Sequence, residues 1–244
     1  MLVEVCAYSL ESCQNAENAG AGRIELCAGL GEGGTTPSTG LLLQVRQHVK
    51  IPVYAMIRPR GGDFVYDERE IETMFTDIEQ VRKAGADGIV VGALLPDGTV
   101  DVALTKSLVQ AAGPLGVTFH RAFDLTPDPK AAVEAIIAAG AERILTSGQH
   151  ANVDLGLETL RRVVAYAAGR IEIMAGGGVK QSNVEQLIAA GVNCIHLTGK
   201  AFRKGRQVFF PESVSMAGEQ PDERSVMYSD LSVLTEVVKR AGGR

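Results

Sequence analysis

The sequence predicts an α/β protein that folds as a single (β/α)8 TIM barrel over residues 1–244. One six-residue phrase occurs four times, as AGAGRI at 19–24, AGADGI at 84–89, AGAERI at 139–144 and AGVNCI at 190–195. Because Ala-Gly ends a helix and the following Ile opens an apolar run of strand length, each copy marks a helix-to-strand joint. Strand and helix patterns alternate between these joints, which favours parallel pairing and closure into a barrel.

The elements follow one another in a regular order. Strands are expected at 2–6, 23–27, 53–58, 88–92, 116–120, 143–147, 171–175 and 194–198. Helices are expected at 10–18, 39–48, 68–84, 102–112, 129–139, 153–167, 181–190 and 230–241. In the third helix, Ile71, Ile78 and Val81 share one apolar stripe with the period of an α-helix. The repeated phrase precedes the even-numbered strands, so the barrel consists of four (β/α)2 quarters. A doubly wound open sheet is the alternative, because the pattern does not show closure.

Composition limits the classes of partner. Twenty-four basic and twenty-nine acidic residues give a net charge of −5, which argues against a nucleic-acid partner. Apolar stretches are well short of the ~20 residues that cross a bilayer, and residues 1–10 lack a basic leader, so we expect a cytoplasmic protein without a membrane partner. Four cysteines without CxxC spacing indicate reduced thiols. The longest connection, 199–229, is expected to be a loop over the barrel mouth.

The first two strands both carry Glu-x-Cys. If Val3 and Val5 face the helices, Glu4 and Cys6 face the barrel axis, and the same alternation turns Glu25 and Cys27 inward. Neighbouring parallel strands lie about 4.8 Å apart, so the two thiols should meet near the mouth. Thiol, thioether and imidazole groups favour Cu(I) over hard cations, and inward parity adds three auxiliary donors: His120, His196 and Met174. The plainer interpretation is that these are ordinary buried core residues.

The predicted interior is unusually polar for a barrel. An unpaired carboxylate inside costs several kcal/mol, so Glu4 and Glu25 need partners, and Arg58 is the cation we expect to supply the charge. A structural ion-pair network without any chemistry would explain the same residues equally well.

A second group of residues suggests an anion site at the same mouth. Arginines follow the ends of strands in RPRGGDF at 58–64 and TFHRAFD at 118–124, and glycines follow strands in AGGGV at 175–179 and TGK at 198–200. Guanidinium groups and backbone N–H donors there suit carboxylate or phosphate, although the glycines also fit a tight turn. The residues predicted to bind an anionic substrate are Arg58, Arg60, Asp63, Arg121, Gly176, Gly177 and Gly199. If the protein is an enzyme, His120, Asp124 and Glu25 would be its acid or base groups. The glycine-rich GEGGTTPS at 31–38 lacks GK[ST], so no nucleotide is expected.

Six phrases together resemble the copper homeostasis protein CutC family: EVCAYS at 4–9, RIELCAGLGEGGTTPS at 23–38, IRPRGGDF at 57–64, TFHRAFD at 118–124, ILTSGQ at 144–149 and IMAGGGV at 173–179. SVSM at 213–216 also resembles the closing loop of that family. The resemblance implies a cytoplasmic barrel that binds copper and often forms a homo-oligomer, with Cys6 and Cys27 as Cu(I) donors. It also brings Arg58, Asp63, His120, Arg121 and Asp124 to the mouth, which a copper carrier alone would not require, so catalysis on a small anionic metabolite stays open.

Overall fold

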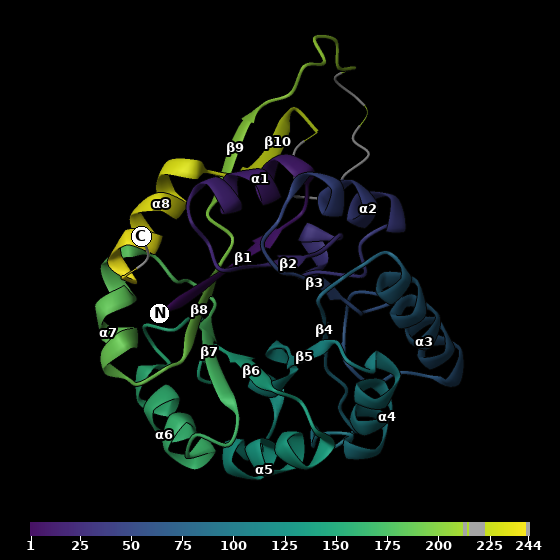
Figure 1. The fold of residues 1–244 in the computed structure, drawn as a ribbon, viewed down its shortest axis with the longest axis vertical. Helices are drawn as coiled ribbons and strands as arrows, with labels where there is room; N and C mark the ends of the chain where they lie inside the picture. The colour runs from purple at the N-terminus through teal and green to yellow at the C-terminus, as the bar shows by residue number, and fades with distance from the viewer. Residues whose placement is uncertain (212–213, 215–222, 243–244) are drawn as a thin grey trace.

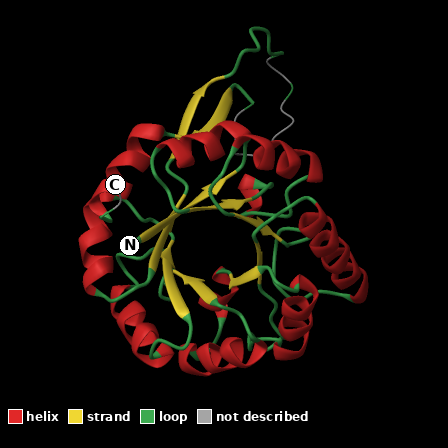
Figure 2. Ribbon diagram, in the orientation of Figure 1, coloured by secondary structure: helices red, strands yellow, loops and turns green. Residues whose placement is uncertain are grey.

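The computed structural model of the chain describes residues 1–211, 214 and 223–242. Its eight inner strands pair in parallel and in chain order, and β1 also pairs with β8, which closes the barrel. Helices surround this barrel as an outer ring (Figures 1 and 2). The predicted TIM barrel is therefore confirmed, and the open sheet is excluded. The strands are β1 (Leu2–Ala7), β2 (Arg23–Leu26), β3 (Val53–Met56), β4 (Gly88–Val91), β5 (Gly116–Phe119), β6 (Arg143–Thr146), β7 (Glu172–Gly176) and β8 (Cys194–Leu197).

One helix follows each strand, and most helices begin at a capping side chain. The side chains of Ser9, Ser38, Asp67, Asp101, Asp128 and Asp230 each accept a hydrogen bond from an N–H group of the first helical turn. The helices are α1 (Leu10–Asn18), α2 (Thr39–His48), α3 (Glu68–Lys83), α4 (Val102–Ala112), α5 (Pro129–Ala139), α6 (Leu157–Ala167), α7 (Val184–Ala189) and α8 (Leu231–Arg240).

Two helices are shorter than predicted. Residues 181–183, expected as the start of α7, form a separate 3-10 turn. The helix expected from residue 153 begins at Leu157 instead, immediately after Gly156. A Cβ atom on Gly156 would lie 1.9 Å from the carbonyl oxygen of Ser147. The chain therefore makes a tight contact between backbones there, which delays the start of α6.

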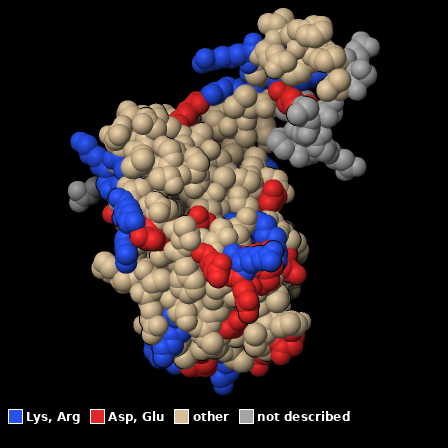
Figure 3. Space-filling model, turned by 90° about the vertical axis from the view of Figure 1, so that its right-hand side faces the viewer, with Lys and Arg blue, Asp and Glu red and all other residues tan. Residues whose placement is uncertain are grey.

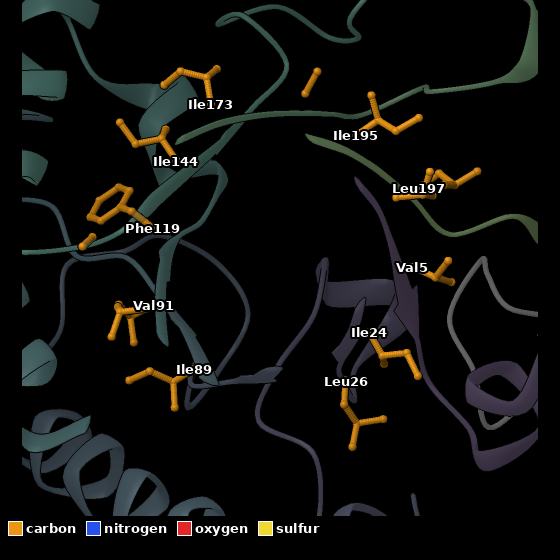
Figure 4. Packing of buried hydrophobic residues seen from close by; sticks show 14 of the residues in the cluster. Val5, Ile24, Leu26, Ile89, Val91, Phe119, Ile144, Ile173, Ile195 and Leu197 are labelled. Carbon is orange, nitrogen blue, oxygen red and sulfur yellow. The ribbon is translucent and has the colours of Figure 1, made fainter. Parts of the chain in front are cut away.

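The main hydrophobic core lies between strands and helices. Val5, Ile24, Leu26, Ile144 and other outward-facing strand residues form a ring around the barrel (Figure 4). The interior holds separate, smaller apolar clusters, one of which contains Cys6, Cys27 and Met56. The predicted alternation of side chains along the strands is therefore observed, and the polar residues of β1 and β2 face the axis.

The segment after β8 differs from the loop predicted at 199–229. It contains an antiparallel pair, β9 (Lys200–Lys204) and β10 (Ser225–Ser229), which extends outward as an arm beside α1 instead of covering the mouth (Figure 1). Ser229 anchors the base of the arm, because its N–H donates to Ser12 Oγ at 3.0 Å and its carbonyl accepts from Asn15 at 2.9 Å. Most of the SVSM phrase at 213–216 lies outside the described residues.

The surface shows no separation of charge on the face seen in Figure 3, where acidic and basic side chains lie side by side. Among the described helices, none is long and apolar enough to cross a membrane.

Candidate functional site

A cavity of about 490 Å³ opens at the carboxyl ends of the barrel strands. Side chains from β1, β2, β3, β6 and β8 line it, together with residues that follow β5, β7 and β8. This is the end of the barrel at which TIM-barrel proteins place their binding sites. The cavity is therefore lined by one of the two predicted thiols, Cys6, and by residues of the predicted anion-binding loops at 175–179 and 198–200, on different parts of its wall.

The two predicted thiols lie side by side, and Cys6 lines this cavity. The Sγ atoms of Cys6 and Cys27 lie 3.8 Å apart, and both cysteines are free and buried. The hydrogen bond from Cys27 lowers the pKa of Cys6 against the opposing effect of burial, and His196 lowers it further. Burial raises the pKa of Cys27, as does the negative charge that develops on Cys6. Cys6 is therefore the thiol that ionises first.

His196 links this thiol pair to a buried ion pair. Its Nδ1 atom lies 2.8 Å from Glu4 Oε1, and the other carboxylate oxygen of Glu4 accepts a hydrogen bond from Arg23 Nε. Burial alone would raise the pKa of Glu4, but His196 and then Arg23 outweigh it and lower the pKa to about 2. Burial would likewise lower the pKa of His196, but the Glu25 carboxyl, the Cys6 thiol and Glu4 raise it. His196 is thus held as a cation beneath the cavity.

The expectation that Arg58 balances Glu4 and Glu25 is wrong. Arg23, at the start of β2, pairs with Glu4 instead. Arg58 lines the cavity, but its Nη1 atom donates to the carbonyl oxygens of Glu32 and Gly34, and its Nη2 atom donates to that of Gly62. Arg58 follows the end of β3, and its guanidinium ties the neighbouring loops together, so within the described structure it forms no ion pair with either carboxyl group.

Glu25 has no arginine partner among the described residues. Its Oε2 atom accepts from Cys27 Sγ at 3.4 Å and lies 3.7 Å from His196 Nε2, whereas Oε1 is buried without a hydrogen bond. Burial, followed by the charge of Cys6, raises the pKa of this carboxyl. The ligand atoms of Cys6, Glu25 and His196 lie within 4.8 Å of one another, so these three residues form a group that could hold a metal ion.

Two predicted auxiliary copper donors lie elsewhere. Met174 is fully buried and does not line the cavity, because its sulfur packs deeper in the barrel and accepts a hydrogen bond from Arg23 at 3.6 Å. Met56 is the thioether that clusters with the thiols. His120 lines the cavity but is not in the three-residue group. Of the predicted auxiliary donors, only His196 lies beside Cys6.

His120 is a neutral hydrogen-bond donor at the wall of the cavity. Its Nδ1 atom accepts from the N–H of Ala122 at 3.1 Å, so the neutral ring carries its proton on Nε2. Burial, followed by the charge of Arg58, lowers the pKa of His120 to about 3. Its Nε2 atom is buried and has no hydrogen-bond partner in the described structure.

Asp124, the second predicted acid or base, is occupied by structural hydrogen bonds. It accepts from the side chains of Thr146, Ser147 and Arg121 and from the backbone N–H groups of Ser147 and Gln149. These contacts fix the loop after β6 against the turn after β5. Asp124 therefore orients Arg121, which lines the cavity.

The remaining predicted anion-binding residues divide into two groups. Gly177 and Gly199 line the cavity, whereas Gly176, Arg60 and Asp63 do not. Arg60 pairs with Glu70 at 2.5 Å and with Asp63 at 3.0 Å, and this cluster braces the loop between β3 and α3. Gly176 is buried within β7. Because side chains alternate along β7, the next residue, Gly177, is the one that lies at the mouth.

Sequence reasoning missed several residues of the interior. Arg23 has the same parity as Glu25, and Tyr54 the same as Met56, so the alternation could have identified both. The guanidinium groups of Arg23 and Arg143 lie 4.9 and 5.6 Å from the Tyr54 ring. Lys200, by contrast, belongs to the TGK loop at 198–200 that was predicted to lie at the mouth, and it lines the cavity at the base of the arm.

Comparison with known proteins gives the family. The sequence profile of the CutC family matches residues 1–201. The chain belongs to the CutC family. It is 47% identical over 240 residues to the copper homeostasis protein cutC homolog of Mus musculus, which covers 98% of this chain and 86% of that protein. The homolog of Homo sapiens is 47% identical over 233 residues, or 95% of this chain and 85% of that protein.

Solved structures agree with this membership. The crystal structure of a copper homeostasis protein CutC from Streptococcus agalactiae superposes with a TM-score of 0.77 at 36% identity, over 81% of this chain and 98% of that one. An aldolase named QR15 superposes with a TM-score of 0.63 at 18% identity, over 81% of this chain and 89% of that one, and shows the barrel fold alone. This CutC family member thus has the fold that its resemblance implied.

Proposed function

We propose that this chain acts in copper homeostasis by binding Cu(I) between Cys6 and Cys27. The observation that carries the proposal is the separation of 3.8 Å between the sulfur atom of Cys6, which lines the cavity, and that of Cys27, which is fully buried. Two thiolates are soft ligands that select Cu(I), whereas zinc in a structural site needs four nitrogen or sulfur ligands.

The surroundings of the pair support a soft monovalent ion. Met56 packs against both thiols, and His196 lies within reach of Cys6. Glu25 and His196 would add a hard oxygen and an imidazole, but His196 is engaged by Glu4 and must release its proton before it can bind a metal. The thiols are therefore the first ligands, and copper uptake displaces the proton that Cys27 carries.

A copper titration tests this function. Titration with Cu(I) under reducing conditions, against a chromophoric competitor, is expected to saturate near one ion per chain. A Cys6→Ser, Cys27→Ser protein should lose this binding, whereas Cys13→Ala, Cys194→Ala should retain it, because those two thiols lie away from the cavity. Equal affinity in the Cys6→Ser, Cys27→Ser protein would refute the proposal.

Catalysis on a small anionic metabolite is a second candidate, and Glu25 is the observation that favours it. A carboxyl with a raised pKa that lines a cavity can donate a proton to a bound ligand. Screening anionic metabolites for turnover, with Glu25→Gln as the paired variant, tests this candidate. Turnover that Glu25→Gln abolishes would support it, and equal turnover by both proteins would remove Glu25 from the reaction.

We also propose that the protein works in the cytoplasm as a homo-oligomer, as its family resemblance implied. The arm offers apolar surface for self-association, because Val208 is 95% exposed and Phe209 is 76% exposed. Light scattering of the purified chain, compared with a Val208→Ser, Phe209→Ser protein, tests the assembly. A monomeric mass for the unmodified chain would contradict it.

A further inference from the structure

Hydrogen-bond donors gather on the part of the cavity wall that follows β5 and β7. The thiols lie on β1 and at the end of β2, so the hydrogen-bond donors and the thiols belong to different strands of the barrel. The cavity is also much larger than one ion and two sulfur atoms require, at about 490 Å³. The donors are therefore available to a ligand other than the metal.

Arg121 is held in one orientation with part of its guanidinium free. Its Nε atom donates to Asp124 at 2.7 Å, and its Nη2 atom donates to Ser147 Oγ at 2.8 Å. Among the described residues, Nη1 has no hydrogen-bond or ion-pair partner. Two anchored nitrogens remove most of the rotational freedom of this side chain, so binding a ligand at Nη1 costs little further ordering.

The free edge of Arg121 lies over a glycine backbone. A Cβ atom on Gly177 would be 3.3 Å from Nη1 of Arg121, and the φ angles of Gly177 and Gly178 are +97° and +80°. Within the described part of the chain, no acceptor takes a hydrogen bond from the N–H group of either glycine. A side chain at Gly177 would meet the guanidinium and strain the backbone, whereas glycine keeps these N–H groups accessible at the cavity.

His120 adds a donor of fixed direction. Because Ala122 donates to Nδ1, the proton lies on Nε2, which is buried and without a partner in the described structure. His120 is 4% exposed and lines the cavity. An unpaired buried N–H group is costly, and a ligand acceptor would relieve that cost.

The charges around the cavity favour an anion. Arg58, Arg121 and Lys200 line it, and among the described lining residues Glu25 is the one acid. Burial raises the pKa of Glu25, so this carboxyl opposes an anion less than an exposed carboxylate would. A low-dielectric pocket with excess positive charge attracts and retains small anions.

We propose that Arg121, His120 and the N–H groups of Gly177 and Gly178 form a binding subsite for the oxyanion, carboxylate or phosphate, of a small metabolite. Every group in the subsite donates, so the ligand must supply acceptor oxygens. The subsite goes beyond copper binding and does not depend on it, because neither Cys6 nor Cys27 belongs to it.

An NMR titration tests the subsite directly. The probes are inorganic phosphate and malonate, each added to 15N-labelled full-length protein without metal, with sodium chloride at matched ionic strength as the reference. We expect saturable shifts of the Gly177 and Gly178 amide signals and of the His120 ring N–H signal. Stronger binding of phosphate would assign a phosphorylated ligand, and stronger binding of malonate a carboxylate ligand. The proposal would be overturned if chloride reproduces the shifts, or if neither phosphate nor malonate shifts these signals.

Variants separate the subsite from the copper site. Arg121→Gln should weaken binding of the preferred anion at least tenfold, as expected for loss of a charged hydrogen bond. Arg82→Gln, which changes an arginine away from the cavity, should bind as the unmodified protein does. The Cys6→Ser, Cys27→Ser protein should also retain the anion, so failure of copper binding and failure of anion binding are distinguishable. If Arg121→Gln folds and binds the anion equally well, the proposed role of Arg121 is wrong. If that variant does not fold, the amide shifts of the unmodified protein still test the subsite.

Discussion

The Nδ1 atom of His196 lies 2.8 Å from Oε1 of Glu4, so the imidazole stands between a buried ion pair and the thiol that faces the cavity. Glu4 is fully buried and pairs with two cationic side chains, Arg23 and His196. This relationship explains how a barrel tolerates a carboxylate in its interior: strands β8, β1 and β2 each contribute one member of the network. The thiol site is therefore adjacent to the buried charge network of Glu4, Arg23 and His196.

Glu4→Gln is therefore expected to destabilise the fold by about 3 to 5 kcal/mol, because it leaves two buried cations without their counter-charge. Urea unfolding at neutral pH measures the loss. Glu72→Gln, at an exposed position on α3, is the matched control and should change the free energy of unfolding by less than about 0.5 kcal/mol. A loss below about 1 kcal/mol in Glu4→Gln would show that the network contributes little to stability.

The cysteines should differ in reactivity. Cys6 lines the cavity and its pKa is lowered, first by the hydrogen bond from Cys27, whereas burial raises the pKa of Cys13, Cys27 and Cys194. Because thiolate is the nucleophile, iodoacetamide at neutral pH should label Cys6 first in the native protein, and Cu(I) should protect it. Peptide mapping by mass spectrometry measures the order. The denatured chain, in which all four thiols should react, is the control; equal native labelling of Cys13 and Cys6 would contradict the assignment.

The sequence allows prediction of the barrel because its signals are local. Ala-Gly joints and apolar alternation depend on a few neighbouring residues, and all eight strands lie where they were expected. The facing of Cys6 and Cys27 follows from the same alternation, and register then brings the end of β2 beside the end of β1. The 3.8 Å contact between these sulfur atoms is thus a consequence of strand parity.

The partners of charged groups could not be predicted in the same way. Arg58 follows β3 and was expected to reach the interior carboxylates, but loop carbonyls on its own side of the barrel satisfy it. Arg23 begins β2 with the same parity as Glu25, but alternation along a strand does not show which carboxylate an inward arginine pairs with. The pairing of β9 with β10 joins segments separated by about 20 residues, which periodicity does not reveal.

His120 is expected to make the free energy of unfolding fall as the solution is acidified below pH 6.5. Burial lowers the pKa of His120 to about 3, so between pH 6.5 and 3 the unfolded chain binds a proton at this site and the native chain does not. The contribution of His120 to stability therefore rises with pH across this window, by an amount on the order of 3 to 5 kcal/mol. Glu25 contributes in the opposite direction above pH 4.5, because burial raises the pKa of its carboxyl in the native chain. Glu4, whose pKa is lowered to about 2, adds a further loss below pH 4.5.

Urea unfolding at a series of pH values tests this dependence. Between pH 6.5 and 3, His120→Gln should lose less stability on acidification than the unmodified protein does, whereas the contributions of Glu4 and Glu25 remain in both proteins. His48→Gln, at an exposed position on α2, should leave the curve unchanged. If His120→Gln and the unmodified protein lose stability in parallel over the whole range, His120 does not carry the effect.

Gly92 is expected to set the position of the His120 ring. A Cβ atom at this position, just after β4, would lie 2.3 Å from Cε1 and 2.4 Å from Nδ1 of His120. Gly92→Ala should therefore destabilise the protein by about 1 to 3 kcal/mol, the range for overpacking in a buried site, and should displace the imidazole from the cavity wall. Gly40→Ala is the control, because Gly40 lies in the first turn of α2 with no atom within 4 Å of the added methyl group. Alanine there should stabilise the helix by up to about 1 kcal/mol. Urea unfolding of the two variants measures both effects, and equal stability of Gly92→Ala and the unmodified protein would show that the ring can move aside freely.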